Sequence, residues 1–166
     1  METIAKEKKS YIKLGFSGEE TEDIVNSMNL LLANYHVFYQ KLRNYHWNVT
    51  GGDFFDLHDK FEELYTETVT NIDDSAERIR VFGMTPMSTL KEYLQNSSIK
   101  ETGTDLSADA MLKEVIRDIE TLDSYLIEAI DNAAEYGDVA TVEMMNKMVK
   151  SLEKHHWMLK AFMTKK

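Results

Sequence analysis

Two histidines and a glutamate in the first half of the chain combine residue types that bind transition metals. His46 and His58 are twelve residues apart on either side of a Gly-Gly pair, and Glu62 follows His58 by four residues. Because residues four apart share a helix face, His58 and Glu62 can bind the same ion. Histidine nitrogen and carboxylate oxygen together suit iron, manganese or zinc better than calcium.

Asp73 and Glu77 repeat the four-residue spacing further along the same predicted helix. Glu62 and Asp73 are eleven residues apart, which is roughly 16 Å at ~1.5 Å per residue. A metal ligand must lie about 2 Å from its ion, so the two pairs of one chain cannot bind one ion. Either they are separate half-sites, or a two-fold interface joins the pair of one chain to the pair of another.

The residues alone also allow a structural interpretation. A histidine on an apolar stripe is most often a core or interface residue, and acidic residues at this spacing most often form a solvated helix face. Glu153 and His156 make one Glu-x-x-His motif of the kind that di-iron bundles use twice, but the chain has no second copy. We therefore expect His155 and His156 to pack or lie at the surface.

The glycines divide the chain into segments with helical periodicity. We predict helices over 18–49 and 54–82, a third from about 107 to 137, and a fourth after Asp138. The connection 83–106 has room for one short helix. Two hairpins joined by a long crossover predict an all-α, ferritin-like four-helix bundle with a short extra helix in the crossover.

Local patterns refine these helices. Ser17 and Glu20 fit a capping box at the start of the first helix, and Asp53 is the expected N-cap of the second. His46 lies on the apolar stripe of the first helix. The expected inward residues of the second helix are Leu57, Phe61, Leu64, Tyr65, Val69, Ile72, Ala76 and Ile79.

Composition limits the classes of function. The 166 residues suffice for one domain, and the absence of cysteine excludes disulfides, thiolate metal sites and cysteine nucleophiles. A formal net charge of −10 attracts cations and repels nucleic acid over most of the surface. No signal peptide or membrane span is visible, so we expect a cytoplasmic protein with no membrane partner.

The stretches "NYHWNVTGGDFFDLHDKFEELY" and "NIDDSAERI" closely resemble the Dps family, the mini-ferritins known as DNA-binding proteins from starved cells. "KHHWMLKAF" extends the resemblance to essentially the whole chain. The resemblance implies a homo-oligomeric hollow shell, a dodecamer, with ferroxidase sites at its dimer interfaces. It implies oxidation of Fe(II), with hydrogen peroxide favoured over oxygen, storage of Fe(III) mineral and protection against oxidative stress.

The resemblance also assigns residues. It implies that His46, His58 and Glu62 ligate from one chain and Asp73 and Glu77 from its dimer mate. Two irons would share each site, the second bound weakly, and zinc can substitute for them. Trp47 matches a tryptophan beside the iron site, although plain interface packing explains it too. Acidic pores of the family suggest an iron-conducting role for Glu135, Asp138 and Glu143, whereas Asp138 is equally explained as an N-cap.

DNA binding is the alternative function, because some members of the family bind DNA through a lysine-rich tail. We expect a flexible tail over 1–16 and the bundle domain over 17–166. Lys6, Lys8 and Lys9 are the candidate DNA contacts, but Glu2 and Glu7 offset part of their charge. We therefore predict weak or no DNA binding near physiological salt. A bare helical scaffold is the third hypothesis, and it leaves the five candidate ligands without a joint purpose.

Overall fold

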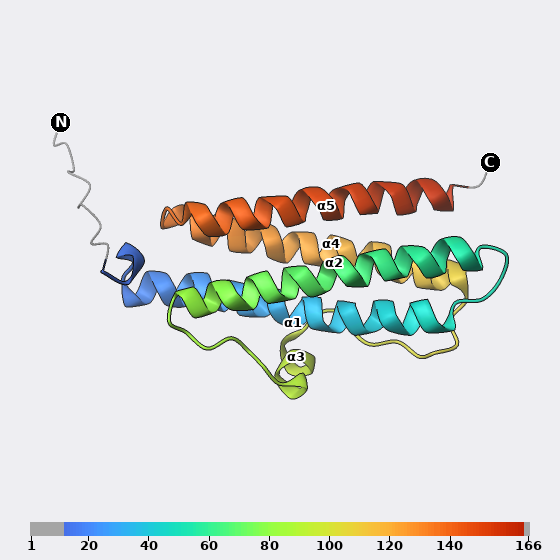
Figure 1. Ribbon diagram of the computed structural model, residues 1–166, viewed down its shortest axis with the longest axis horizontal. Coiled ribbons are helices and arrows are strands. Elements are labelled where there is room, and N and C mark those ends of the chain that lie inside the picture. The colour runs from blue at the N-terminus through green and yellow to red at the C-terminus, as the bar shows by residue number, and fades with distance from the viewer. Residues whose placement is uncertain (1–11, 165–166) are drawn as a thin grey trace.

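The computed structural model describes residues 12–164, whose longest elements are four helices (Figure 1). In chain order the elements are η1 (Ile12–Gly15), α1 (Gly18–Asn48), α2 (Phe54–Val81), α3 (Leu90–Asn96), α4 (Ala108–Glu135) and α5 (Val139–Met163). Over the described range there is no strand. Each long helix begins within two residues of its predicted start, and α1, α2 and α4 also end within two residues of their predicted ends.

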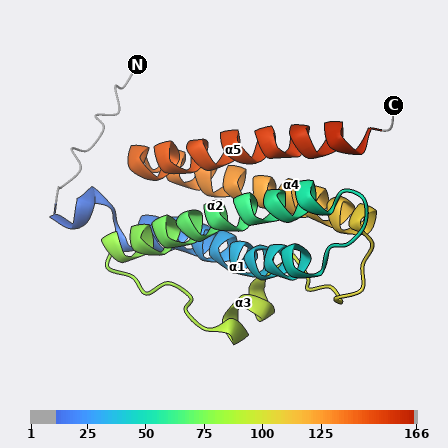
Figure 2. The ribbon, with the colours of Figure 1, turned by 45° about the vertical axis from the view of Figure 1, so that its right-hand side comes forward.

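Two antiparallel hairpins make up the bundle. Helices α1 and α2 form one hairpin, α4 and α5 form the other, and α1 packs against α4. The connection from α2 to α4 runs along the bundle and carries α3 against α1 (Figures 1 and 2). This arrangement confirms the predicted ferritin-like bundle with a short extra helix in its crossover.

The helix ends follow local chemistry. Ser17 and Glu20 form the predicted capping box: the Ser17 hydroxyl accepts from the Glu20 N–H, and the Glu20 carboxylate accepts from the Ser17 N–H at 2.7 Å. Gly83 and Gly137, just past α2 and α4, have φ of +77° and +74°, where glycine ends a helix without steric cost. Asp53 occupies the N-cap position of α2, but its side chain makes no capping hydrogen bond.

The core-facing side of α2 differs from the predicted stripe. Leu57, Phe61, Leu64 and Ile79 are buried as expected. Val69 is not, because 46% of it is exposed. Three small or amide residues between the apolar ones are buried instead, namely Thr68, Asn71 and Ser75. The prediction that Val69 faces the core was therefore wrong. The hydrophobic pattern selected the valine, whereas the polar residues just named occupy buried positions of this helix.

The crossover is fastened to α1 by one buried amide. The Asn34 side-chain oxygen accepts hydrogen bonds from the Ser97 hydroxyl and from the backbone N–H groups of Ser98 and Ile99, at 3.1, 2.9 and 3.0 Å. Asn34 is fully buried, so leaving these groups unpaired would be costly. This contact fixes where the crossover leaves α3.

A buried ion pair links α1 to α4. The Lys41 ammonium lies 2.8 Å from Glu114 and 2.7 Å from Asp118, and its side chain is almost completely shielded from solvent. Burial raises the pKa of Asp118 to about 6, although the Lys41 charge acts in the opposite direction. The pair therefore holds a carboxylate that loses its charge in mild acid.

Part of the predicted tail lies outside the described residues. This applies to residues 1–11 and hence to Lys6, Lys8 and Lys9, the candidate DNA contacts. Residues 12–15, within the same predicted tail, form the short 3-10 helix η1. Among the described helices, none combines the length and apolar character needed to span a membrane.

Candidate metal centre

The α1–α2 hairpin places the end of one helix beside the start of the next. Five residues, 49–53, separate the two helices, and Gly51 within them has a φ of +112° that other residues rarely adopt. Val49 caps α1 with its N–H bonded to the Tyr45 carbonyl, and its side chain is buried. The tight turn brings the last turn of α1 against the first turns of α2.

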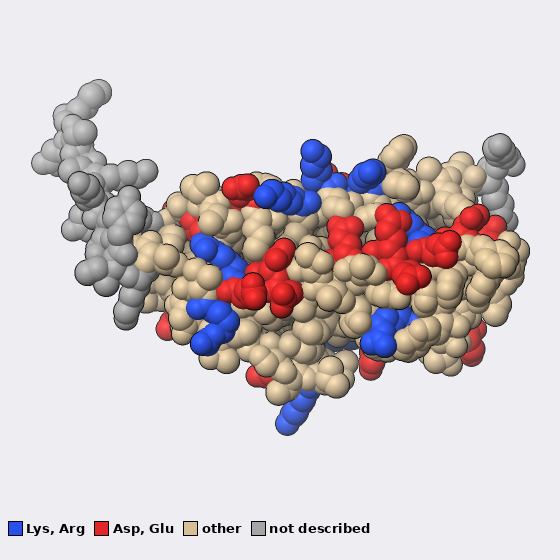
Figure 3. All heavy atoms as spheres, viewed as in Figure 1, with Lys and Arg blue, Asp and Glu red and all other residues tan. Residues whose placement is uncertain are grey.

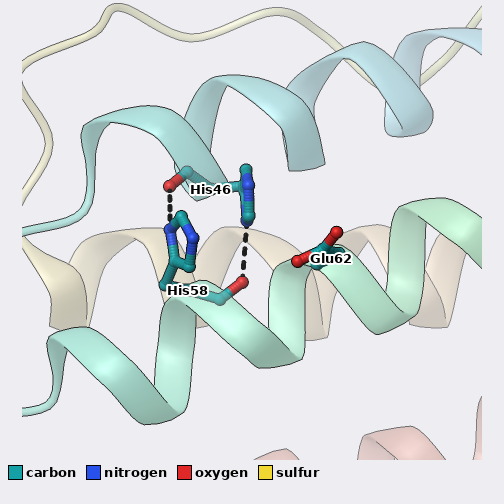
Figure 4. Close-up of side chains that lie close together, drawn as sticks. All are labelled: His46, His58 and Glu62. Carbon is teal, nitrogen blue, oxygen red and sulfur yellow. Dashed lines mark hydrogen bonds between the residues drawn. The ribbon is translucent and has the colours of Figure 1, made fainter.

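His46 and His58 bind each other's backbone across this hairpin. His46 Nδ1 lies 2.8 Å from the His58 carbonyl oxygen, and His58 Nδ1 lies 2.8 Å from the His46 carbonyl oxygen. The rings stack with centroids 3.7 Å apart and planes 22° from parallel. Figure 4 shows the two reciprocal bonds between α1 and α2. The prediction that the turn brings the two histidines together is confirmed.

The reciprocal bonds fix the tautomer of both rings. A carbonyl oxygen only accepts, so each Nδ1 must carry the proton and donate. In a neutral ring the Nε2 atom then keeps its lone pair and can ligate a metal. Hydrogen bonds of this kind from the distal ring nitrogen commonly orient metal-binding histidines. Both histidines are thus prepared as Nε2 ligands.

Glu62 completes a three-residue cluster. One ligand atom each from His46, His58 and Glu62 can be chosen so that all lie within 4.8 Å of one another. His46 is buried at 8% exposure, His58 is half-buried and Glu62 is exposed, so the cluster opens to solvent on the carboxylate side. In the described part of the chain no other group of three or more acidic or histidine residues meets this spacing.

Aromatic rings surround the two histidines. Phe54 stacks on His58 with centroids 5.1 Å apart, and the Tyr65 ring lies edge-on to His46 at 5.3 Å. Partial desolvation and the nearby Glu62 carboxylate raise the pKa of Tyr65. The sequence placed Tyr65 only on the apolar stripe of α2. Its spacing of three residues from Glu62 was the signal that could have placed it at the site.

Asp73 and Glu77 do not join this cluster within one chain. They lie further along the continuous helix α2, exposed, and among the described residues neither side chain makes a hydrogen bond or ion pair. They nevertheless share a face with Glu62. At ~100° per residue, the exposed residues Glu62, Thr66, Val69, Asp73 and Glu77 fall within about 80° of arc. Figure 3 shows acidic side chains gathered over α2 on this side of the molecule.

Trp47 follows His46 on α1 but points into solvent. It is 57% exposed, and the Arg43 guanidinium lies over its indole ring at 4.6 Å from the centroid. Arg43 also lies 5.4 Å from the centroid of the Tyr39 ring. Within one chain the indole therefore contacts a cation at the edge of the histidine cluster.

The three candidate pore residues differ in their surroundings. Glu135 and Glu143 are exposed, and Glu143 pairs with Lys147 at 3.1 Å. Asp138 is buried, and one of its oxygens accepts from the Thr141 N–H and the Arg78 guanidinium at 3.2 and 2.7 Å. The N-cap interpretation of Asp138 is confirmed by this geometry.

The second histidine pair serves to join helices. His155 is buried between Glu67 and Lys60 of α2, with its Nε2 2.9 Å from Glu67 and its Nδ1 3.0 Å from Lys60. His156 lies 2.8 Å from Glu120 of α4. Burial of the one and the surface position of the other agree with their predicted packing roles.

Comparison with known proteins identifies the relatives of this fold. A family model described as a ferritin-like domain matches residues 25–166. General stress protein 20U of Bacillus subtilis is 43% identical over 143 residues, which cover 86% of this chain and 99% of that protein. The DNA protection during starvation protein of Brevibacillus brevis is 46% identical over 136 residues, covering 82% and 91%.

A solved structure agrees with these sequences. The Dps protein from Vibrio cholerae O1, described as a member of a broad superfamily of ferritin-like diiron-carboxylate proteins, superposes with a TM-score of 0.89. It is 33% identical, and the match covers 96% of this chain and 100% of that one.

Proposed function

The chain belongs to the Dps proteins of the ferritin-like family, and we propose that it is a ferroxidase that oxidises Fe(II) with hydrogen peroxide and stores the Fe(III) product. Membership of the family supports iron storage and protection as the general role. The proposal adds the reaction, the oxidant and the position of the site. Fe(II) is the substrate here, not a resident cofactor.

The cluster of His46, His58 and Glu62 carries the proposal. Two neutral imidazoles and one carboxylate suit Fe(II), and the two imidazoles are oriented before any ion arrives. Three ligands from one chain leave coordination positions free, and we propose that these accept a second chain's carboxylates, a weakly bound second iron and the oxidant. Zinc would occupy the same ligands as a substitute, because nitrogen and oxygen donors also suit that ion.

A second copy of the chain supplies the missing carboxylates in this proposal. The face of α2 that carries Glu62 also carries Asp73 and Glu77, and the midpoint between the two pairs falls between Thr66 and Val69. If two α2 helices cross antiparallel at that midpoint, His58 and Glu62 of each chain meet the Asp73–Glu77 pair of the other chain. One dimer then holds two equivalent sites. The exposed Val69 would lie at the centre of the contact, where an apolar side chain gains from burial.

The proposed chemistry follows from having two ferrous ions at one site. Each ion gives one electron, and the two electrons with two protons from the solvent reduce one molecule of hydrogen peroxide to two molecules of water without releasing a hydroxyl radical. The ferric products hydrolyse and release protons, which the surrounding carboxylates can accept. Acid should weaken loading of the site, because a protonated imidazole cannot ligate.

Other predicted roles extend the proposal to the shell. We propose that twelve chains enclose a cavity and that Glu135 and Glu143 draw Fe(II) through its pores. Asp138 contributes there mainly by starting α5, since its carboxylate is committed to Thr141 and Arg78. Trp47, one residue from His46, would lie beside the bound iron, and a cytoplasmic location fits this use of Fe(II). DNA binding through Lys6, Lys8 and Lys9 remains the alternative function, without a supporting contact among the described residues.

Co-expression of two defective variants tests the two-chain site. One variant is His46→Ala/His58→Ala and the other is Asp73→Asn/Glu77→Gln. Each homodimer has only damaged sites, but a mixed dimer has one intact site and one doubly damaged site. Random pairing therefore restores about a quarter of the sites. The measurement is the absorbance rise after peroxide is added to anaerobically loaded Fe(II), with His156→Ala/Asp74→Asn as the matched control.

The outcomes separate the hypotheses. Recovery of fast oxidation on co-expression, with each variant inactive alone and the control active, supports a site shared between chains. No recovery from two folded, inactive variants would mean that each chain needs both of its own pairs, as separate half-sites, and would overturn the dimer arrangement. Wild-type rates in both variants would mean that these residues only pack, and the DNA-binding hypothesis would then be preferred.

A further inference from the structure

The C-terminal half of α5 carries large apolar side chains on the side away from the core. This helix packs against α4 and lies at the edge of the bundle opposite α3 (Figures 1 and 2). Trp157 is 66% exposed, Phe162 44% and Met158 39%. Apolar side chains gathered in this way on a surface mark contacts with a partner. A partner that covers them gains from their burial.

Two lysines extend this surface toward the middle of the helix. At ~100° per residue, four exposed residues fall within about 60° of arc opposite the buried residues of α5, namely Lys150, Lys154, Trp157 and Ala161. Together with Met158 and Phe162 they form the outer α5 face. Within residues 12–164, neither Lys150 nor Lys154 forms an ion pair through its side chain. The face thus has an apolar end and a positive end, both without a partner in that range.

The proposed shell requires more than the contact through α2. A two-fold contact uses the same surface on both chains, so by itself it joins two chains and no more. A larger closed assembly needs a second contact, and a contact between two different surfaces closes into a ring when it repeats around an axis. The outer α5 face lies on a different helix from Val69, so one chain has separate surfaces for the two contacts.

Charge selects the kind of surface that the outer α5 face can meet. If the face met its own copy, its lysines would lie against the other chain's lysines or against its apolar end, and they would gain no acidic partner. The chain as a whole has a net charge of −10, and acidic side chains gather over α2 in Figure 3. An acidic surface of another copy would pair the lysines while Trp157 and Phe162 became buried. The face therefore complements a different surface of this chain better than it complements itself.

We propose that the outer α5 face is a second subunit contact, which binds an acidic surface of another copy of the chain and closes a ring of copies. This inference rests on the proposed shell and adds the contact that a two-fold α2 face cannot supply. The two contacts have separate tasks. The α2 contact completes the metal site, whereas the α5 contact encloses the product. An assembly that loses only the α5 contact should still oxidise Fe(II) but should not keep the ferric product in solution.

Light scattering on Trp157→Glu tests the contact. We expect the molar mass to fall from that of the proposed shell, about 230 kDa for twelve chains of 19.2 kDa, to about 38 kDa for two chains. The absorbance rise after peroxide is added to Fe(II) should persist, and the ferric product should precipitate. Ile127→Glu is the matched control, because Ile127 is a 44% exposed apolar residue on α4, and it should keep the mass of the wild type. Circular dichroism should show unchanged helix content in both variants.

Neutral lysine variants test which kind of surface is bound. We expect Lys150→Gln/Lys154→Gln to raise the protein concentration at which the assembly is half dissociated by about 2- to 10-fold, because exposed ion pairs are lost. Lys91→Gln/Lys113→Gln, with exposed lysines of α3 and α4, makes the same change in net charge and should leave that concentration unchanged. A lower concentration of half dissociation for Lys150→Gln/Lys154→Gln would mean that the face meets its own copy, and would overturn the inference.

The remaining outcomes separate this contact from the metal site. An unchanged mass of Trp157→Glu would exclude the outer α5 face as a subunit contact. If that variant instead bound vesicles of anionic phospholipid more weakly than the wild type does, the face would dock on a membrane surface. A failure of the proposed ferroxidase is different, because His46→Ala/His58→Ala would then oxidise Fe(II) as fast as the wild type while its mass stayed that of the shell.

Discussion

At the scale of single residues, the buried ion pair around Lys41 predicts how stability depends on pH. The Lys41 ammonium is neutralised by Glu114 and Asp118 inside the α1–α4 contact. Because burial raises the pKa of Asp118 to about 6, the folded state holds this proton more tightly than the unfolded state does. The stabilisation from holding this proton is complete below the unfolded pKa and is lost as pH rises through about 6.

We expect Lys41→Met to lower the free energy of unfolding by about 3–5 kcal/mol at pH 8, because ionised Asp118 is then buried without its cation. At pH 5 the carboxyl is protonated, so the loss should be clearly smaller. Denaturant unfolding at both pH values and at one protein concentration measures the difference. An equal loss at the two pH values would show that Lys41 matters through packing alone.

Residue types and spacing predicted the histidine cluster but not its details. The twelve-residue separation around Gly51 was enough to bring His46 and His58 together, because a tight turn leaves few alternatives. The reciprocal backbone bonds could not be predicted, since they depend on how closely α1 and α2 pack. Nor could the contact of Tyr65, because a tyrosine on an apolar stripe is ordinarily part of the core.

At the scale of elements, α2 and α5 are joined where α5 begins. Asp138 caps α5 and binds Arg78 of α2 at 2.7 Å. We expect Asp138→Ala to lower the free energy of unfolding by about 2–4 kcal/mol, because it removes the cap and leaves the partly buried Arg78 guanidinium unpaired. Asp138→Asn should cost less, since asparagine is also a good N-cap. Thermal unfolding compares the two variants. Ser17→Ala is the control, because it removes an N-cap of α1 that makes no ion pair, and it should lower the free energy of unfolding by about 1 kcal/mol.

The relative cost of the two Asp138 variants identifies the function of the carboxylate. If Asp138→Asn unfolds as readily as Asp138→Ala, the ion pair with Arg78 dominates and the cap adds little. If both variants melt like the wild type but take up iron slowly, Asp138 acts in the pore, and its N-cap contributes little to stability.

Element bounds were predictable because glycine and capping residues mark them chemically. The face of α2 was less predictable. Its buried Thr68, Asn71 and Ser75 are polar and do not follow the hydrophobic pattern, and the Thr68 hydroxyl donates to the Leu64 carbonyl of the same helix at 2.7 Å. Val69 was assigned to the core because one chain was considered alone. Its exposure is explained if a second chain covers it.

At the scale of the whole molecule, Val69 tests the assembly. We expect Val69→Arg to separate the α2 faces, because two like charges would meet near the two-fold axis. The molar mass measured by light scattering should fall from about 230 kDa, the mass of the proposed shell of twelve chains of 19.2 kDa, and the proposed peroxide-driven iron oxidation should fall with it. Val81→Arg, an exposed valine elsewhere on α2, is the matched control. An unchanged mass and rate for Val69→Arg would exclude this face as the contact.

Net charge governs the second whole-molecule prediction. With −10 per chain, long-range electrostatics oppose contact with DNA, and only a few lysines near the N-terminus favour it. We expect no retardation of linear DNA in a gel near 0.15 M salt, where phosphate contacts are screened. Retardation that is lost in Lys6→Gln/Lys8→Gln/Lys9→Gln would show that the tails act together and would favour the DNA-binding hypothesis.

The reciprocal histidine bonds also have a consequence for how the protein can be emptied. Proteins whose metal ligands are organised only by the ion unfold when a chelator removes it. Here the helical hairpin itself orders His46 and His58, so a chelator should remove a bound ion and leave the ligands and the bundle intact. If the proposed site holds iron, it would fill and empty many times without refolding, which is the behaviour required of a reusable reservoir.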